Sequence, residues 1–171
     1  MTSLFKAAVL TASDRSFRGE REDKSGMVLR DLLLKLPAEV SVYKIIPDDR
    51  ALLAAALIDC ADYLQCDFIL TTGGTGLAPR DQTPEATRDV IEKEVPGIIQ
   101  AIREVSLKKT PMAMLSRAVA GVRGRTLIIN LPGSPSGVVE AFAAIKPVLV
   151  HAVELIHGEV KDCQKLSSLP H

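Results

Sequence analysis

Short apolar runs alternate with stretches of helical spacing along the chain. Four runs are typical of strands, because turn residues bound each of them: residues 5–12, 40–46, 67–72 and 125–131. Apolar residues recur at helical spacing elsewhere and predict helices over residues 26–36, 50–64, 83–94, 98–107, 138–145 and 147–157. Strands that alternate with helices indicate an α/β fold with a mostly parallel sheet.

Local signals predict where several of these helices begin. Ser25 is a suitable cap for the first helix. Thr83 and Pro84 are typical of a helix start, since they combine a cap with a proline in the first turn. Pro147 is expected to open the last helix. Residues 110–124 are less regular, and we expect a short helical turn there, followed by a strand or a loop.

The length and composition fit one globular domain. The chain has 171 residues, of which 47% are hydrophobic and 25% are charged. A chain of this size can bury about 70% of its surface, so it needs no disulfides to build a core. We expect a single domain over residues 1–171, with a core at about 5–158 and a C-terminal tail at 159–171.

The balance of charges argues against nucleic-acid and membrane partners. The 21 basic and 21 acidic residues give a formal net charge of zero, whereas proteins that bind such anionic surfaces are usually basic. Aromatic residues make up only 4%, which weakens any platform for stacking bases. The longest apolar run, residues 51–58, is too short to span a bilayer, and residues 1–13 lack signal-peptide features. We therefore expect a cytoplasmic protein.

The cysteines and histidines predict neither a disulfide framework nor a zinc site. Cys60, Cys66 and Cys163 are odd in number and have no C-x-x-C spacing. The three histidines lie near the C-terminus without metal-ligand spacing. Cys60 and Cys66 fall on the apolar side of a predicted helix and at its exit, so we expect both in the core.

Four unusual segments directly follow predicted strands. They are Ser13-Asp14-Arg15, Pro47-Asp48-Asp49, Gly73-Gly74-Thr75-Gly76 and Pro132-Gly133-Ser134. If the strands are parallel, all four segments emerge at one edge of the sheet, which is where α/β proteins bind their ligands. This convergence predicts a functional site at that edge.

The glycine-rich segment and two aspartates suggest phosphate chemistry. Residues 73–76 have little side-chain bulk, so their N–H groups could cradle a phosphate, although a plain tight turn explains them equally well. Asp48 and Asp81 could hold Mg²⁺, which takes one or two carboxylates plus substrate phosphates. Each aspartate alone is better explained by a helix dipole. The pair, with the glycines between, favours metal-assisted phosphate chemistry.

Three further polar residues are candidates for a second part of the site. Ser116 and Arg117 could recognise another anion, because arginine offers a fork of donors to phosphate. Arg117 taken alone is more simply a surface residue. Asn130 ends a predicted strand, where it could simply satisfy nearby backbone groups.

Five separated motifs resemble the molybdopterin-binding family that includes MogA and the gephyrin G domain. The most specific is TTGGTGLAPRDQTPEAT at residues 71–87. The others are SDRSFRGEREDKSG (13–26), IPDD (46–49), TPMAMLSRAVAGVRGRTLIINLPGSPSG (110–137) and ELIHG (154–158). They occur in the family's order, and the resemblance covers about residues 5–158. The stretch from 110 to 137 is most similar to the molybdopterin adenylyltransferase branch.

The resemblance implies a fold, an assembly and a reaction. The family fold is a three-layer α/β/α sandwich, and its usual assembly is a homotrimer. Such proteins transfer AMP from Mg-ATP to the terminal phosphate of molybdopterin, giving adenylyl-molybdopterin and pyrophosphate. A molybdate-inserting enzyme then takes over the product. Mg²⁺, ATP and molybdopterin are therefore the expected cofactor and substrates.

The resemblance also implies a role for each matched residue. Asp48 and Asp81 match acidic residues that the family requires, which assigns them to Mg²⁺ and catalysis, while Gln82 replaces the family's usual apolar residue. The residues that match nucleotide- and phosphate-binding positions are Asp14, Gly73, Gly74, Thr75, Gly76, Pro132, Gly133 and Ser134. The residues that match pterin-binding positions are Ser116, Arg117 and Asn130. The first motif also contributes Gly19, Asp23, Ser25 and Gly26.

Two other functions remain open on the sequence. The chain could be a non-catalytic module that binds molybdopterin, as relatives within scaffold proteins do. It could also be a nucleotide-sugar pyrophosphatase on the same fold, like the competence-damage proteins. The LSR and NLPG matches, at residues 115–117 and 130–133, speak against the pyrophosphatase.

Overall fold

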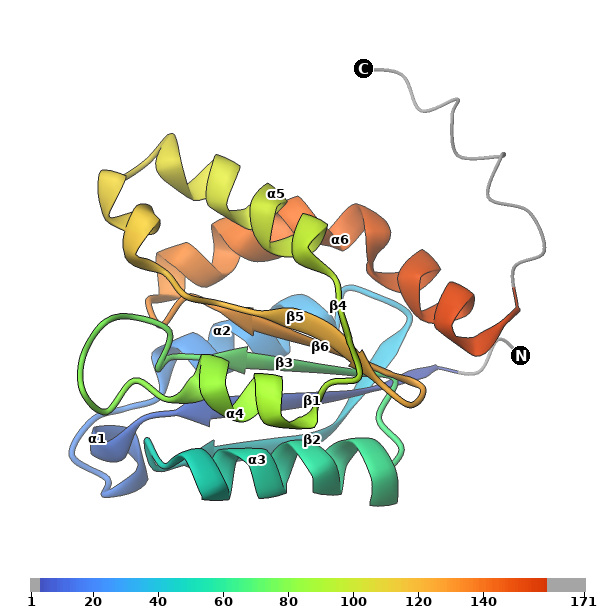
Figure 1. The fold of residues 1–171 in the computed structure, drawn as a ribbon, viewed down its shortest axis with the longest axis horizontal. Helices are drawn as coiled ribbons and strands as arrows, with labels where there is room; N and C mark the ends of the chain where they lie inside the picture. The colour runs from blue at the N-terminus through green and yellow to red at the C-terminus, as the bar shows by residue number, and fades with distance from the viewer. Residues whose placement is uncertain (1–3, 160–171) are drawn as a thin grey trace.

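A computed structural model describes residues 4–159, so the predicted tail lies outside it except for Glu159. The sheet has six strands in the order β2-β1-β3-β6-β5-β4 (Figure 1). Their bounds are β1 Phe5–Ala12, β2 Ala38–Ile46, β3 Phe68–Thr72, β4 Lys93–Glu94, β5 Ala120–Arg123 and β6 Thr126–Leu131. Strands β2, β1, β3 and β6 pair in parallel, and β5 runs antiparallel to both of its neighbours, β6 and β4. The predicted α/β class with a mostly parallel sheet is confirmed.

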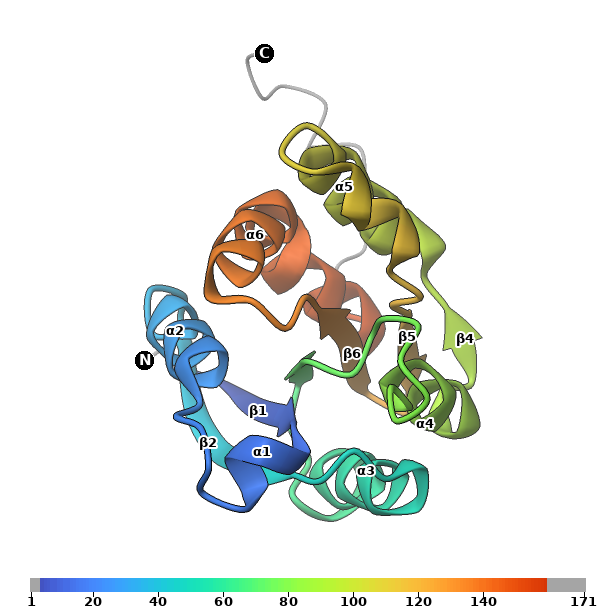
Figure 2. The ribbon, with the colours of Figure 1, turned by 90° about the vertical axis from the view of Figure 1, so that its left-hand side faces the viewer.

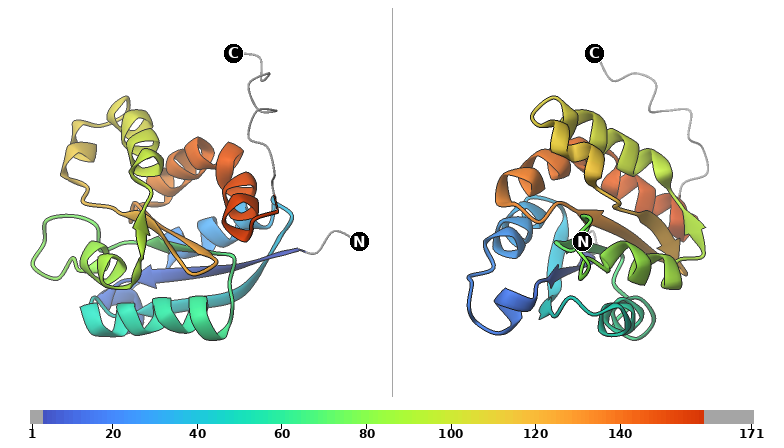
Figure 3. Two further views of the ribbon diagram at one scale, coloured as in Figure 1. Left: turned by 45° about the vertical axis from the view of Figure 1, so that its right-hand side comes forward. Right: turned by 60° about the vertical axis from the view of Figure 1, so that its left-hand side comes forward.

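Helices cover both faces of the sheet and make three layers (Figures 2 and 3). Those of one layer are α2 Lys24–Leu33, α5 Pro96–Leu107 and α6 Pro135–His157. Those of the other are α3 Arg50–Ile58, continued by the π-helical turn η1 Asp59–Tyr63, and α4 Thr83–Val90. The short elements are α1 Asp14–Phe17 and the 3₁₀ turn η2 Pro111–Leu115. This is the three-layer α/β/α sandwich that the resemblance implies.

The central strands are apolar throughout because both faces are buried. In β1, Ala7 and Val9 belong to the core beneath α2, α5 and α6, whereas Ala8 and Leu10 belong to the core beneath α3 and α4. Such strands read as continuous apolar runs rather than alternating ones. Cys60 and Cys66 are buried in the second of these cores, as predicted.

The prediction that Pro147 opens a separate helix is wrong. Pro147 lies inside α6, which runs unbroken from Pro135 to His157. Ile145 and Leu149, on either side of it, are both fully buried against the sheet, while Pro147 itself is exposed. Burial of this continuous apolar stripe outweighs the missing N–H group of the proline. Within residues 4–159, neither α6 nor any other helix is both long and apolar enough to cross a membrane.

Three predicted helix ends also need correction. The cap of α2 is Asp23 rather than Ser25, since the Asp23 carboxylate accepts the N–H of Gly26 at 2.9 Å. Thr83 is the first residue of α4 rather than its cap. The helix predicted to reach residue 94 ends at Val90, because Lys93–Glu94 pairs with β5 as an edge strand. Backbone pairing with β5, distant in sequence, overrides the local helical pattern there.

Candidate active site

The strand register brings the four predicted segments to one edge of the sheet. Ala12 pairs with Ile46, and Thr72 pairs with Leu131, at the ends of their strands. Thr11 and Thr72 are also paired, which sets all four strand ends nearly level. The segments after these ends therefore begin side by side, as the sequence predicts.

The glycine segment after β3 is a tight turn that excludes side chains. Gly73 and Gly74 have φ values of 90° and 66°, in the left-handed region that favours glycine. A Cβ on Gly74 would collide with the Thr83 hydroxyl, which itself donates to the Gly73 carbonyl at 3.0 Å. The start of α4 thus holds this turn in place.

One cavity at this edge, of about 210 Å³, is lined by four acidic residues, and we call it the acidic cavity. They are Glu22, Asp23, Asp48 and Asp81. Other lining residues used below are Gly73, Gly74, Gly133, Arg21 and Lys24. The two predicted catalytic aspartates therefore come together, although they lie on different connections.

Asp14 does not line the acidic cavity but forms hydrogen bonds with Asp48. The Asp14 N–H donates to Asp48 Oδ2 at 2.9 Å, and the Asp48 N–H donates to Asp14 Oδ1 at 3.0 Å. Arg80 pairs with Asp14, with Nε 2.5 Å from Oδ2, and this hydrogen bond lowers the pKa of the Asp14 carboxyl. Asp14 thus links Asp48 to the segment after the glycine turn.

Asp48 and Asp81 have different surroundings. Burial raises the pKa of the Asp48 carboxyl, and the charges of Asp14 and Asp81 raise it further. The Asp81 carboxylate accepts the N–H of Ala78 at 3.0 Å and lies so close to Gly76 that a Cβ there would come within 2.8 Å of it. Asp49 has a simpler role, since it caps α3 by accepting the N–H of Leu52.

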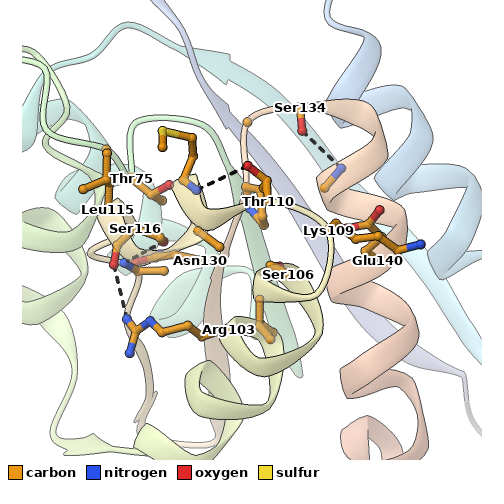
Figure 4. Close-up of a pocket in the computed structure, with 18 of the residues that line it drawn as sticks. Thr75, Arg103, Ser106, Lys109, Thr110, Leu115, Ser116, Asn130, Ser134 and Glu140 are labelled. Atoms are coloured by element: carbon orange, nitrogen blue, oxygen red, sulfur yellow. Dashed lines mark hydrogen bonds between the residues drawn. The ribbon is translucent and has the colours of Figure 1, made fainter.

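A second, larger cavity of about 470 Å³ lies between α5, η2 and the start of α6, and we call it the α5 cavity (Figure 4). Ile99, Ile102 and Leu115 make part of its wall apolar. Polar groups from Thr75, Ser106, Lys109, Ser116 and Ser134 also line it. Gly133 lines both cavities, so the two are adjacent.

The three predicted pterin ligands are placed differently. Ser116 lines the α5 cavity. Asn130 also borders it, but its fully buried amide accepts the Val119 N–H and donates to Thr71 and Thr87 at 2.9–3.0 Å. Asn130 thus satisfies groups within the fold, the alternative that its strand-end position left open. Arg117 lines neither cavity.

The N-terminus of α6 faces both cavities. Ser134 lines the α5 cavity and caps the helix by accepting the Gly137 N–H at 3.1 Å, while Pro135 lines the acidic cavity. A helix N-terminus carries partial positive charge and exposed N–H groups, which favour anions. The predicted phosphate-binding segment 132–134 therefore ends in a feature suited to phosphate.

Sequence reasoning missed three residues that line the cavities. Ser106 has a buried hydroxyl at the wall of the α5 cavity that finds no hydrogen-bond partner in the described part of the chain. The sequence pattern that could have indicated Ser106 is a polar residue among the apolar positions of the helix predicted at 98–107. Arg21 and Lys24 line the acidic cavity and supply positive charge there. They lie in a polar stretch without helical or strand periodicity, so the sequence does not indicate which way their side chains point.

These features define a class of protein: a three-layer α/β/α domain whose strand ends hold a glycine turn, paired carboxylates and a helix N-terminus for an anionic ligand. The particular family follows from comparison with known sequences. Residues 8–151 match the family model described as "Probable molybdopterin binding domain", and the chain belongs to this family.

Relatives and solved structures agree with this assignment. The chain is 46% identical over 153 residues to the molybdopterin adenylyltransferase of Helicobacter pylori strain J99, covering 88% of this chain and 86% of the relative. It is 37% identical to the molybdopterin adenylyltransferase of Escherichia coli K12, covering 97% and 87%. The crystal structure of the molybdopterin biosynthesis enzyme MoaB from Thermus thermophilus is 53% identical, with a TM-score of 0.86 over 91% of this chain and 98% of that one. The resemblance seen in the motifs is confirmed.

Proposed function

We propose that the chain is a molybdopterin adenylyltransferase, which transfers AMP from ATP to the terminal phosphate of molybdopterin and releases pyrophosphate. The observation that carries this proposal is the pair of adjacent cavities that meet at Gly133. One is small and lined by carboxylates, which suits a metal-bound triphosphate. The other is larger and partly apolar, which suits a ring system with polar substituents.

The reaction asks the chain to position its substrates rather than to activate a nucleophile. A phosphate oxygen of molybdopterin is already anionic and forms a bond to the α-phosphorus of ATP. The bond between that phosphorus and the α–β bridging oxygen breaks, and pyrophosphate leaves with the electron pair. No side chain needs to remove a proton in this step. Positioning and charge stabilisation therefore supply the catalysis.

Asp48 and Asp81 fit the requirements of Mg²⁺. Two like charges face one cavity, and the raised pKa of the Asp48 carboxyl reflects its burial and their proximity, which a cation would relieve. Within residues 4–159, no three metal-binding side chains form a cluster, so substrate phosphates would have to complete the coordination. When bound, Mg²⁺ would offset the charge of the triphosphate.

The remaining groups would orient the substrates. The N–H groups of the glycine turn and of the α6 N-terminus would bind phosphate oxygens, because both lie beside the acidic cavity. Arg21 and Lys24 would add positive charge at the same wall. Ser106 and Ser116 would meet polar groups of the pterin in the α5 cavity, since the Ser106 hydroxyl has no hydrogen-bond partner within residues 4–159.

The test is an assay of the purified chain with Mg-ATP and molybdopterin. We expect adenylyl-molybdopterin and pyrophosphate in equal amounts. Tight binding of molybdopterin without turnover would favour the non-catalytic module instead. Hydrolysis of ADP-ribose would favour the pyrophosphatase. The transfer of product to a molybdate-inserting enzyme stays a prediction, which a pull-down with that enzyme can test. The cytoplasmic location also stays a prediction.

A further inference from the structure

Arg117 directs its hydrogen bonds to other parts of the protein. Its backbone N–H donates to the Thr75 carbonyl at 2.9 Å. Its side chain donates from Nε to the Gly76 carbonyl and from Nη2 to the Asp81 carbonyl, both at 2.8 Å. Three hydrogen bonds therefore attach Arg117 to the segment that runs from the glycine turn to Asp81.

The fourth contact of Arg117 is an ion pair with Glu85 in the first turn of α4. Burial raises the pKa of the Glu85 carboxyl, but the hydrogen bonds from Arg117 and from the Glu85 backbone, together with the charge of Arg117, outweigh burial, so the pKa is lowered. The other carboxylate oxygen of Glu85 is buried and has no hydrogen-bond partner among the residues that the structure describes. Glu85 thus holds the guanidinium in place, and neither residue lines the acidic cavity or the α5 cavity.

The segment that carries Asp81 needs such an external support. The contacts between Asp81 and Ala78 lie within the segment and do not hold it against the sheet. Besides the contacts of Thr83 with Gly73 and Gly74, two arginines connect the segment to other elements: Arg80, which pairs with Asp14, and Arg117. A guanidinium is suited to this role, because its planar fork can donate to several carbonyls at fixed angles, whereas a lysine is a single point charge.

We propose that Arg117 is a positioning residue that fixes the main chain of Gly76 and Asp81, so that the Asp81 carboxylate faces the acidic cavity. Arg117 acts through Asp81 and does not bind the pterin. The inference rests on the proposed function, in which Asp81 takes part in AMP transfer.

The experiment compares Arg117→Lys, Glu85→Gln and the double variant with the unaltered protein. Arg117→Lys keeps the charge and loses the fork, so kcat should fall by about 10- to 100-fold through misplacement of Asp81. The KM values for ATP and molybdopterin should stay within about threefold, since no substrate contact is removed. Glu85→Gln should lower kcat less. The double variant should be little worse than Arg117→Lys, because both changes disturb one unit.

Amide hydrogen exchange gives a readout that does not depend on turnover. Residues 73–82 should exchange faster in Arg117→Lys and in Glu85→Gln than in the unaltered protein. Arg50→Lys is the matched control, because it removes another two-pronged arginine pair, with Asp89 of α4, whose N–O distances are 2.6 Å. It should change neither kcat nor the exchange of residues 73–82.

Two results would overturn the inference. A higher KM for molybdopterin with kcat unchanged would make Arg117 a substrate ligand. Unaltered exchange of residues 73–82 in Glu85→Gln would show that the contacts do not hold the segment, and this variant decides the matter if Arg117→Lys does not fold. Absence of AMP transfer in the unaltered protein would instead refute the proposed function, and the exchange measurement would still test the role of Arg117.

Discussion

Asp48 is held where its charge is unfavourable for folding. Burial raises the pKa of its carboxyl, the hydrogen bond from Asp14 opposes this, and the charges of Asp14 and Asp81 add to the increase. A carboxyl whose pKa is raised on folding stabilises the folded state fully only below its unfolded pKa of about 3.9. That stabilisation is lost as the pH rises through the folded pKa. The charged Asp48 therefore lowers the stability of the folded protein at neutral pH, at a position that belongs to the proposed metal site.

Replacing Asp48 by asparagine should stabilise the protein at neutral pH. The amide can still accept the Asp14 N–H but carries no charge, so we expect a higher Tm at pH 7 and a difference that disappears toward pH 4 and below. Asp62→Asn is the control of opposite sign. The hydrogen bond from Arg123 lowers the pKa of Asp62, so loss of this charge should lower the Tm at pH 7. Thermal unfolding between pH 3 and pH 8 measures both. A lower Tm for Asp48→Asn at pH 7 would contradict the role of burial.

Gly74 should be sensitive to a single methyl group. An alanine there would take a left-handed φ and would collide with the Thr83 hydroxyl. Gly124 also has a positive φ, of 54°, but a Cβ there would meet nothing within 4 Å. Each alanine variant should lose about 1–2 kcal/mol through backbone strain. Only Gly74→Ala should also bind Mg-ATP about 10- to 100-fold more weakly.

Calorimetric titration with Mg-ATP separates these two glycine variants. Nucleotide affinity equal to that of the unaltered protein in folded Gly74→Ala would reduce the glycine segment to an ordinary turn.

The sequence predicts those site residues whose position depends only on strand order. Asp48, Gly73 and Gly74 follow strand ends, so recognising the strands was enough to bring them together. Asn130 could not be assigned in this way, because its amide is satisfied by Thr71 and Thr87, which are far away in the sequence. The direction of a side chain at such a position depends on how separate elements pack together, and the neighbouring sequence does not reveal it.

At the scale of elements, the strands were easier to predict than the helix ends. The central strands are apolar on both faces, and this gives unmistakable runs. The short strand β4 exists only through pairing with β5, so residues 93–94 show no strand pattern. The continuation of α6 through Pro147 likewise depends on the apolar stripe that it buries.

Pro147→Ala should stabilise the protein. A proline inside a helix costs about 3 kcal/mol of stability through its missing N–H and its steric clash. Replacing it by alanine makes the unfolded chain more flexible, which lowers the stability by about 0.4–1 kcal/mol. We expect a net gain of about 2–2.6 kcal/mol in urea unfolding. Activity should not change, because Pro147 lies far along α6 from Ser134 and the cavities. A loss of stability would mean that α6 needs the proline to place Leu149 against the sheet.

At the scale of the whole molecule, residues 97–117 form the predicted surface for a homotrimer. In this segment Met114 is 65% exposed and does not line the α5 cavity. A stable interface of this kind buries more than about 1,000 Å² and has an apolar centre. Exposed methionine at such a position supports the prediction that a second copy covers it.

Light scattering at micromolar concentration tests this assembly. We expect a mass three times the 18.4 kDa of the chain, which Met114→Glu should lower. Tyr63→Glu, at an exposed position on η1, should leave the mass unchanged. A mass near that of one chain for the unaltered protein would contradict the trimer and would leave the reaction untouched.

The molecule as a whole places two cavities of different chemistry at one edge of its sheet, and Gly133 lines both of them. Adenylyl transfer requires two anionic substrates to meet in a fixed orientation, which this arrangement supports. The loss of charge at one carboxylate should therefore stop the reaction without preventing the pterin from binding.

The most direct measurement is AMP transfer by the unaltered protein and by Asp81→Asn, with pterin binding followed in parallel. The amide keeps the shape of the carboxyl but not its charge. We expect adenylyl-molybdopterin and pyrophosphate from the unaltered protein, turnover at least about 100-fold lower from Asp81→Asn, and similar pterin affinity for both. Asp48→Asn should act in the same direction but less severely. Turnover by Asp81→Asn at the unaltered rate would contradict the account.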